Sequence, residues 1–536
     1  MPGLLQLLII ATGLLTTGCH AATVIVSGND TAAIAAAIEQ SQPGDTILLP
    51  AGTYTLSASI APKSETRLVG AGQDKTTLLL TGDKPTAFVS LSGVTDVTVS
   101  DLTLDGQNGP VAAVGVSAHD CRRLRLERLT IRNLAAEAFG PHGIHFNGEN
   151  PTRQHGVTDS LIRDCTIENI APERPWGAGI RLSWGSSRNQ VLNCRISNTG
   201  RGGIFGDNGS TDLIIRGNTV SGSHGERLGI EVWGGCDRSL VEDNRIDHWL
   251  SIGGSDWCAV RRNTISCHEG CFGFCGIEAI GSFLVVTDNV VDDGQIIGLS
   301  VSSPLRRQYH YYGNNTFRMC SQWASQFQGE SRGIQNHYLY RCRFADTTVG
   351  REKLWYPGFE GNGFRITGNT REMVLEECEM TGNGRLGMEL LGAGVDCLDF
   401  VRCVVKGNKG AAMVPLAQEG QAGPPFGALE WRDCVVEGNG DNTLAPAAPF
   451  PYPPPTAGFS GPERVRVGEQ VRLASTARAA AGPLKRIFWD LGDGIPMMGP
   501  RVRHVYPQPG TYTVTQIVWD THGRGARAAR PLVVTP

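Results

Sequence analysis

The sequence predicts an all-β protein made of a right-handed parallel β-helix with an N-terminal capping helix, followed by a small β-sandwich. The first observation is a recurring phrase, such as GIHFNG from Gly143 and GFRITG from Gly363, in which apolar and variable residues alternate. The second is a phrase that follows each of these and ends in Asn or Cys, as in LVEDN up to Asn244. Because two short strands cannot bury a core alone, such units must stack on their neighbours.

The fixed Asn or Cys of the second phrase predicts a ladder along the helix axis, since neighbouring coils lie about 4.8 Å apart. Each inward amide can bond the coils above and below, and Cys serves there as a small residue that is easily buried. We therefore expect these positions to be structural, and the cysteines among them to be buried free thiols. The ladder positions are Cys165, Cys194, Asn218, Asn244, Asn263, Asn289, Asn315, Cys342, Cys378, Cys403 and Cys434.

Residues 30 to 42, DTAAIAAAIEQSQ, form the predicted helix. Asp30 or Thr31 can cap it, alanines favour it, and Ile34 and Ile38 share one face. The first coil of a solenoid would otherwise expose backbone and apolar interior, so we expect this helix to cover the open end of the core.

The coil region, about residues 24 to 440, resembles the pectate-lyase-like superfamily of right-handed parallel β-helix proteins. The helix followed by PGDTILLPAGTYTL also resembles the start of many secreted β-helix carbohydrate enzymes. The resemblance implies the fold and a carbohydrate-active protein. It leaves the activity open, because the fold hosts lyases, glycosidases, epimerases and non-enzymatic adhesins.

The chain divides into four predicted parts: a signal peptide at 1–22, the β-helix at 23–440, a proline-rich linker at 441–455 and a β-sandwich at 456–536. FWDLGDG at 488–494 and HVYPQPGTYTV at 504–514 resemble the polycystic-kidney-disease-type (PKD) domain. In secreted bacterial enzymes such a module is usually a spacer or a weak polysaccharide-binding unit. The resemblance makes Trp489 and Asp493 fold residues rather than catalytic ones.

The N-terminal run LLQLLIIATGLL has the length of a signal-peptide core and not of a membrane span. The following TTGC resembles a bacterial lipobox, in which case Cys19 carries lipid and attaches the protein to a membrane. The alternative is ordinary cleavage near Ala21 or Ala22. Both alternatives predict an extracytoplasmic protein, either secreted or a cell-envelope lipoprotein.

Charge and motifs exclude several functions. The formal net charge is −4 over 536 residues, and no basic cluster with interleaved aromatic residues indicates a nucleic-acid partner. No phosphate-binding glycine loop, nucleophile elbow or zinc helix motif is present in the sequence. In SCHEGCFGFCG, the residues Cys267, Cys271 and Cys275 favour a local disulfide over a metal site, and we expect no bound metal or cofactor, except Ca2+ if the protein is a lyase.

The candidate chemistry lies on the outer face of the first repeated strand. If the Ile and the following apolar residue point inward, the two variable positions point outward and form two columns. The first column is His145, Arg181, Phe205, Glu231, Ser251, Glu278, Ser300, Gln326, Arg365 and Glu389. The second is Asn147, Ser183, Asp207, Trp233, Gly253, Ile280, Ser302, Gln328, Thr367 and Leu391.

These columns support three hypotheses with a polysaccharide as partner. The first is a glycoside hydrolase that uses Glu231 with Glu278, about 10 Å apart over two coils, or with Asp207, about 5 Å away in the next coil. The second is a lyase or epimerase on uronates, with His145 or His142 as base and Arg181 as the group that neutralises the uronate. The third is a non-catalytic glycan-binding surface protein. Residues expected to line a sugar cleft are Trp184, Trp233, Trp249, Asp256, Gln326, Gln328 and Glu330.

Overall fold

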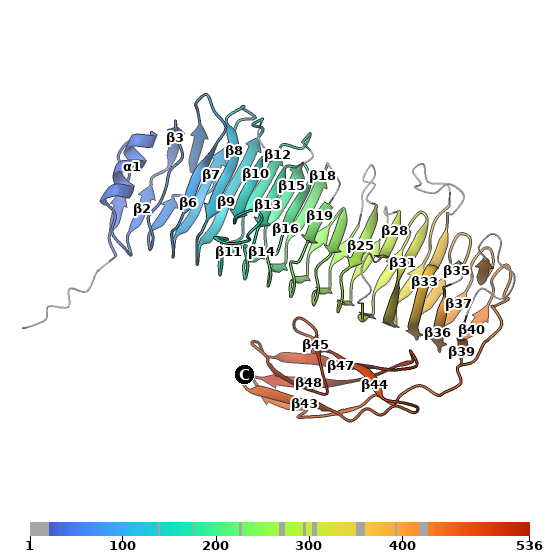
Figure 1. The fold of residues 1–536 in the computed structure, drawn as a ribbon. Coiled ribbons are helices and arrows are strands. Elements are labelled where there is room, and N and C mark those ends of the chain that lie inside the picture. The colour runs from blue at the N-terminus through green and yellow to red at the C-terminus, as the bar shows by residue number, and fades with distance from the viewer. Residues whose placement is uncertain are drawn as a thin grey trace, which may run out of the picture.

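The computed structural model describes residues 21–137, 140–174, 176–224, 228–266, 274–292, 296–302, 308–349, 360–391, 394–416 and 427–536, without the side chains of 330–332 and 416. It confirms the predicted architecture. Parallel strands wind into a long solenoid with three faces, and a small antiparallel sandwich follows it (Figure 1). Within the described residues, no helix is long and apolar enough to span a membrane. Residues 1–20 of the predicted signal peptide, which include Cys19, lie outside the described part of the chain.

The first face of the solenoid is a continuous parallel ladder that contains the GIHFNG-type phrases. Its strands are β6 (Thr86–Ser92), β8 (Ala112–His119), β10 (His142–Asn147), β13 (Ala178–Ser183), β16 (Gly202–Asp207), β19 (Leu228–Trp233), β22 (Trp249–Gly253), β25 (Cys275–Ile280), β28 (Ile297–Ser302), the first part of β31 (Trp323–Tyr340), the first part of β33 (Asn362–Glu376), β35 (Met388–Leu391) and β38 (Met413–Leu416).

The second face contains the phrases that end in Asn or Cys. Its strands are β1 (Thr23–Ile25), β2 (Thr46–Leu49), β4 (Arg67–Gly70), the first parts of β7 (Thr98–Asp105) and β9 (Arg125–Leu134), β11 (Leu161–Arg163), β14 (Gln190–Leu192), β17 (Ile214–Arg216), β20 (Leu240–Glu242), β23 (Ala259–Arg261), β26 (Val285–Thr287), β29 (His310–Gly313), the later parts of β31 and β33, β36 (Asp396–Val401) and β39 (Leu429–Arg432).

The third face completes each coil. Its strands are β3 (Gly52–Leu56), β5 (Thr76–Leu80), the later parts of β7 and β9, β12 (Thr166–Ile170), β15 (Arg195–Thr199), β18 (Thr219–Ser223), β21 (Arg245–Ile246), β24 (Thr264–Ile265), β27 (Val290–Asp292), β30 (Thr316–Arg318), β32 (Arg343–Ala345), β34 (Glu379–Thr381), β37 (Val404–Lys406) and β40 (Val435–Glu437).

The core follows from the alternation in the first phrase. Ile144 and Phe146 on β10, like Ile180 and Leu182 on β13, are fully buried inside the solenoid. At the N-terminal end, helix α1 (Thr31–Gln40) covers this core with Ile34, Ala37 and Ile38 (Figure 1), and Asp30 caps it by accepting the Ala33 N–H at 2.8 Å. Both predictions for the helix are confirmed.

The Asn ladder is present as predicted. Each Nδ2 of Asn218, Asn244, Asn263 and Asn289 donates to the Oδ1 of the next ladder Asn at 2.9 to 3.0 Å, up to Asn315. The residue before each ladder position has a left-handed backbone, for example Asp243 at φ 57° and Asn314 at φ 53°, a conformation that Asn, Asp and Gly favour. All six ladder cysteines are free thiols, and all but the half-buried Cys434 are buried as expected; they are Cys165, Cys194, Cys342, Cys378, Cys403 and Cys434.

The sandwich consists of two antiparallel layers with one parallel edge pair. The smaller layer is β41 (Phe459–Ser460), β43 (Gln470–Ser475) and β46 (Arg501–Val505), and the larger is β42 (Arg464–Arg466), β48 (Gly525–Thr535), β47 (Gly510–Asp520), β44 (Leu484–Asp490) and β45 (Met497–Met498). Trp489 is fully buried between the layers and donates to the Gly499 carbonyl, and Asp493 contacts His504, in accord with their predicted roles in the fold.

The sandwich is not held away from the solenoid as a spacer would be. It folds back along the second face of the later coils (Figure 1), where Phe488, Ile517 and Trp519 pack against Tyr311, Tyr338 and other apolar residues of that face. The contact also includes buried ion pairs, Arg261 with Asp490 at 2.6 Å and Arg524 with Asp399 at 3.0 Å. An outward apolar stripe on a sheet normally marks a contact surface, and here the sandwich covers it.

Candidate functional site

The strand register of the first face aligns the two predicted columns. His145 pairs in register with Arg181, Arg181 with Phe205, and Phe205 with Glu231. The column continues through Ser251 to Glu278 and beyond. Arg181, Asp207, Glu231 and Glu278 are all at most 9% exposed, so these outward residues are covered and not solvated. A charged cluster buried on the outside of a solenoid needs close partners, and these partners define the site.

Arg181 and Asp207 form the first ion pair of this cluster. The guanidinium of Arg181 donates to Asp207 Oδ2 from Nη2 at 2.7 Å and from Nε at 3.1 Å. Burial raises the pKa of Asp207 and the charge of Arg181 opposes that rise. The other oxygen, Asp207 Oδ1, is buried and has no hydrogen-bond partner among the described residues.

Glu231 is held by a second arginine, Arg201. The two guanidinium nitrogens of Arg201 donate to the two carboxylate oxygens of Glu231, each at 3.1 Å. The Arg201 side chain also lies over the rings of Phe205, at 4.9 Å, and Trp176, at 5.1 Å. A fork of this kind favours the ionised carboxylate.

Glu278 lies in a different environment. The hydroxyl of Ser251, one coil away, donates to Glu278 Oε2 at 2.5 Å. Burial, together with the negative charge of Glu231, raises the pKa of Glu278 to about 7, and the Ser251 hydrogen bond only partly offsets the rise. Glu278 therefore carries a proton at mildly acidic pH, and Glu231 differs from it in being paired with Arg201.

His145 is neutral at ordinary pH. Burial and the nearby charge of Arg181 lower its pKa to about 3. Its Nε2 lies 3.0 Å from Ser183 Oγ, and its ring packs at 4.7 Å against the ring of His142, whose pKa burial also lowers. A neutral imidazole beside an arginine can accept a proton, but the arginine is already paired with Asp207.

The three predicted tryptophans have different surroundings. Trp233 on β19 is 46% exposed and its ring lies over Gly253 of the next coil. Trp184 is half-buried in the turn after β13. Trp249 begins β22 and packs against Phe274 at 5.5 Å, with its indole N–H buried and without a hydrogen-bond partner among the described residues. Of the three, Trp233 offers an accessible ring.

The remaining predicted cleft residues lie further away or have structural partners. Asp256 lies in the turn after β22, where its carboxylate accepts the Ser282 N–H at 2.8 Å and supports the next coil. Gln326 donates to Gln328 at 2.5 Å further along the first face. Glu330 lies in β31, with its side chain outside the described residues. Cys275 is a buried free thiol, and Cys267 and Cys271 fall outside the described chain.

Arg201 and Trp176 were not predicted as site residues. Both lie in turns that precede first-face strands, so the alternation of the repeated phrase does not reach them. Ser251 was placed in the first column, but its bond to Glu278 depends on a side-chain orientation that the pattern does not give. The available signal was the arginine itself, which directly precedes strand β16, one coil away from Glu231.

At the far end of the first column, the carboxylate of Glu389 is buried and held by structural partners. Glu389 is 1% exposed, and its Oε2 accepts the Trp323 indole N–H at 3.0 Å and the Asn362 amide at 3.3 Å. Arg365 lies 3.6 Å from the same oxygen and stacks on Trp323 at 4.2 Å. This carboxylate stabilises the later coils.

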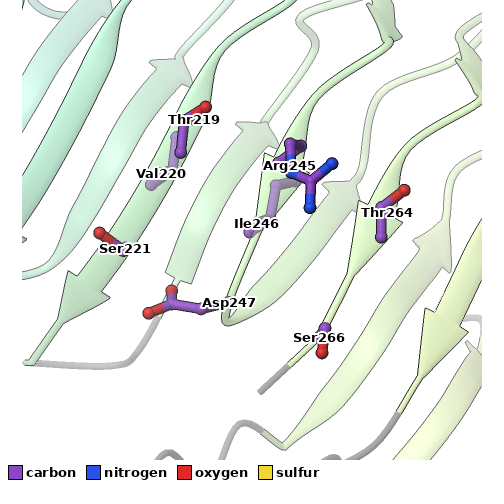
Figure 2. A pocket seen from close by; sticks show the side chains of 8 residues that line it. All are labelled: Thr219, Val220, Ser221, Arg245, Ile246, Asp247, Thr264 and Ser266. Atoms are coloured by element: carbon purple, nitrogen blue, oxygen red, sulfur yellow. The ribbon is translucent and has the colours of Figure 1, made fainter. Parts of the chain in front are cut away.

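A separate hollow of about 180 Å³ lies on the third face, over β18, β21 and β24 (Figure 2). It is lined by Thr219, Val220, Ser221, Arg245, Ile246, Asp247, Thr264 and Ser266. Asp247 is its only acidic residue and accepts the Gly222 N–H at 2.8 Å. The hollow therefore lacks the paired acids of the first face. Over the described residues, no group of three or more His, Cys, Asp or Glu side chains is arranged to hold a metal ion.

Comparison with family models agrees with both halves of this architecture. Residues 87–247 match the right handed beta helix region, and residues 452–534 match the PKD domain. The chain therefore joins a right-handed β-helix to a C-terminal PKD domain. No curated protein matches the sequence.

Similar solved structures also divide between the two parts. The A-module of the Azotobacter vinelandii mannuronan C-5 epimerase AlgE4 is 16% identical, with 76% of this chain and 100% of that chain covered and a TM-score of 0.40. The catalytic domain of a GH87 α-1,3-glucanase is 15% identical, with 80% and 67% covered and a TM-score of 0.30. A structure of carbohydrate-binding modules from the β-sandwich superfamily is 30% identical over 16% of this chain and 35% of that chain, with a TM-score of 0.15.

Proposed function

We propose that this chain is a carbohydrate-active enzyme that hydrolyses glycosidic bonds in a polysaccharide, with Glu278 as general acid and Glu231 as its partner carboxylate. The observation that carries the proposal is the contrast between these two acids in one column. Burial raises the pKa of Glu278 to about 7, whereas Arg201 pairs with both oxygens of Glu231. Two acids whose environments favour opposite protonation states are the minimum equipment for glycoside hydrolysis.

Spacing supports an inverting mechanism. Ser251 lies between the two acids in register, so their backbones are two coils, or about 10 Å, apart. Retaining enzymes place their carboxyl groups about 5 Å apart, whereas inverting enzymes leave room for a water molecule. In this assignment Glu278 protonates the leaving oxygen, and Glu231 accepts a proton from water that attacks the opposite side of the sugar ring.

The surrounding charges favour a neutral substrate. Arg181 is paired with Asp207 and Arg201 with Glu231, so each arginine near the acids already has a carboxylate partner. A uronate carboxylate entering this site would meet compensated arginines and further acids, and repulsion would oppose its binding.

The second candidate is elimination or epimerisation on a uronate. Its candidate base is His145, which burial and Arg181 keep neutral, although a pKa lowered to about 3 makes this imidazole a weak base at neutral pH. It requires Arg181 to exchange Asp207 for the substrate carboxylate. The third candidate, a non-catalytic glycan-binding protein, requires only the polar face and exposed tryptophans.

The test is incubation with neutral and uronate-containing polysaccharides, with reducing ends and the ultraviolet absorbance of an unsaturated uronate read in parallel. We expect reducing ends without absorbance, an initial product of inverted anomeric configuration by NMR, and losses of more than about 1,000-fold in Glu278→Gln and Glu231→Gln. Glu379→Gln, a surface carboxylate on the third face, is the matched control. Absorbance that disappears in His145→Ala would establish elimination instead, and no product from any polysaccharide would favour the binding protein.

We also infer export from the N-terminal apolar run and the TTGC sequence around Cys19. Mass spectrometry of the mature N-terminus would distinguish a lipidated Cys19 from cleavage near Ala21. Recovery of an uncleaved cytoplasmic chain would contradict export.

A further inference from the structure

Trp233 is an aromatic ring that remains open to solvent next to the proposed acids. It is 46% exposed and follows Glu231 by two residues on β19, so both side chains project from the same outer side of the sheet. In the neighbouring coil it pairs in register with Asp207. A single exposed ring is common on protein surfaces, so its seat on the sheet and its place beside Glu231 are the observations that matter.

Gly253 fixes where this ring lies. It pairs in register with Trp233 from the next coil, and a Cβ added there would lie 2.1 Å from Cε3 and 2.4 Å from Cζ3 of the indole. The six-membered ring therefore rests directly over the glycine. Gly253 itself lies in strand β22 and not in a left-handed conformation, so the backbone does not require a glycine. The close approach of the indole does.

The neighbours in the second column show that this arrangement is particular to one coil. The positions on either side are Asp207, which is engaged with Arg181, and Ile280, which is half-buried. Only between them does a glycine let an aromatic ring lie down on the sheet. The result is a ring supported from below by backbone and accessible from above, within two residues of Glu231.

We propose that Trp233, seated on Gly253, is the platform that binds one pyranose ring of the polysaccharide at the subsite next to the cleaved bond. The C–H-rich face of a pyranose stacks on an aromatic face, whereas its hydroxyl groups bond polar neighbours. A stack of this kind selects sugars with an apolar ring face and needs no charge on the substrate. The proposal rests on the proposed function for its place beside the acids, but binding can be measured separately from turnover.

The test uses the full-length chain and a panel of neutral hexasaccharides, namely β-1,4-glucan, β-1,3-glucan, α-1,3-glucan, β-1,4-mannan and β-1,4-xylan. Binding is measured by calorimetry and by change in tryptophan fluorescence in a Glu278→Gln background, where turnover does not interfere. We expect Trp233→Ala to weaken binding of the preferred hexasaccharide about tenfold and Trp233→Phe about threefold. In the enzyme with Glu278 intact, KM should rise by a similar factor while kcat changes less than about threefold.

Gly253→Ala provides the second variant, because its methyl group would displace the ring without removing it. It should weaken hexasaccharide binding and leave the pH profile unchanged. Trp257→Phe, which alters a tryptophan stacked on Phe283 at 4.1 Å in a turn, is the matched control and should change neither binding nor KM. Circular dichroism and melting of each variant identify any loss of fold.

The outcomes separate the two proposals. Binding and KM unchanged in both Trp233→Ala and Gly253→Ala would overturn the platform, even if Glu278→Gln abolishes hydrolysis. Hexasaccharide binding that is lost in Trp233→Ala while the unsubstituted protein cleaves nothing would retain the platform and overturn the hydrolase.

Discussion

Glu278, the proposed general acid, is unfavourable for folding at neutral pH. In an unfolded chain its carboxyl group has a pKa near 4.5, and in the fold burial raises that pKa to about 7. The folded state therefore binds the proton more tightly. The contribution of this proton to the free energy of unfolding is complete below pH 4.5 and is lost as pH rises through 7. Above that pH, the ionised carboxylate lowers the free energy of unfolding by about 3 kcal/mol relative to the protonated form.

The Ser251 hydroxyl controls where this titration occurs. Its hydrogen bond at 2.5 Å stabilises the ionised Glu278, so removing it leaves burial and the charge of Glu231 unopposed. We expect Ser251→Ala to raise the pKa of Glu278 and to move the alkaline limb of the kcat/KM profile upward by about one pH unit. A profile that does not move, or that moves to lower pH, would exclude Glu278 as the general acid. Ser300→Ala, in the next coil of the same column, is the control.

The sequence allowed the column positions of Glu231, Glu278, Asp207, Arg181 and His145 to be predicted, because the side-chain period of a strand assigns each residue to one face. It did not give their burial or their partners. The ion pair between Arg201 and Glu231 depends on the conformation of the turn before β16, which the repeat of the strands does not predict. The structure also separates Glu389, which looks equivalent in the sequence, from Glu278, because Trp323 and Asn362 already hydrogen-bond to it.

At the scale of the repeated element, the Asn ladder adds side-chain hydrogen bonds to the backbone bonds that connect neighbouring coils. The side chain of Asn263 makes four hydrogen bonds: its Nδ2 donates to Val241 O at 2.9 Å and to Asn289 Oδ1 at 3.0 Å, and its Oδ1 accepts from the backbone and side chain of Asn244 at 3.1 and 2.9 Å. Several of these atoms would lose their partners without the amide.

We expect Asn263→Ala to lower the free energy of unfolding by about 3 kcal/mol, because it leaves buried donors and acceptors unpaired. Asn263→Cys should cost less, since this chain already places cysteines at equivalent ladder positions such as Cys342. Urea unfolding followed by circular dichroism measures both. Equal stability of the alanine variant and the unsubstituted protein would show that the ladder adds nothing to stability.

A second ladder, Asn383 to Asn408 to Asn439, connects the last coils at the turn after the third face. It was not predicted, although each of these asparagines follows a glycine at similar spacing. The period of the phrases predicts which strands stack, and the asparagines in turns become interpretable only once the stacking is known. The capping helix was predictable because its amphipathic pattern is local.

The core of the later coils contains a polar cluster that makes the solenoid sensitive to acid. His310 and His337 are fully buried, with ring centroids 4.8 Å apart, and His310 contacts the Tyr312 hydroxyl at 2.7 Å. Burial lowers the pKa of His310 to about 4 and that of His337 well below its usual value. Both rings are neutral in the fold, whereas an unfolded histidine titrates near pH 6.5.

The stability that depends on these neutral rings is therefore present above pH 6.5 and lost as pH falls through about 4. For His310 alone the linkage corresponds to about 3 kcal/mol. We expect the urea concentration at the unfolding midpoint to decrease as pH is lowered from 6.5 to 4. In the double variant His310→Gln, His337→Gln this midpoint should depend less steeply on pH than in the unsubstituted protein. His155→Gln, an exposed surface histidine, is the control. Identical slopes in all three proteins would remove the buried histidines as the cause.

At the scale of the whole molecule, the PKD domain covers part of the β-helix surface. Its Trp519, Phe488 and Ile517 cover the tyrosines of the second face, and the first face with the proposed site remains on another side of the solenoid. The resemblance to a PKD domain predicted a spacer. It could not predict that the domain packs against the β-helix, because that contact depends on residues of both domains. The outward tyrosines at 309, 311, 338 and 340 were a signal in the sequence, since a solvated strand face seldom alternates aromatic residues in this way.

The ion pair between Arg261 and Asp490 tests whether docking is specific. Both side chains are at most 5% exposed; Arg261 Nη2 donates to Asp490 Oδ1 at 2.6 Å and to Gly494 O at 2.9 Å. Asp490→Ala would leave the guanidinium buried beside an apolar contact without its counter-charge, which typically costs about 3 to 5 kcal/mol. We expect this variant to undock the PKD domain, expand the molecule in small-angle scattering and make the 441–455 linker much more susceptible to protease.

The control is Asp212→Ala, which breaks an exposed ion pair with Arg238 and should cause neither expansion nor protease susceptibility. The double variant Arg261→Met, Asp490→Leu should restore compactness, because an apolar pair of similar volume can replace a buried ion pair. If Asp490→Ala stays compact and protease-resistant, the apolar contact alone holds the domain; if the double variant remains expanded, the ion pair itself specifies the docked arrangement.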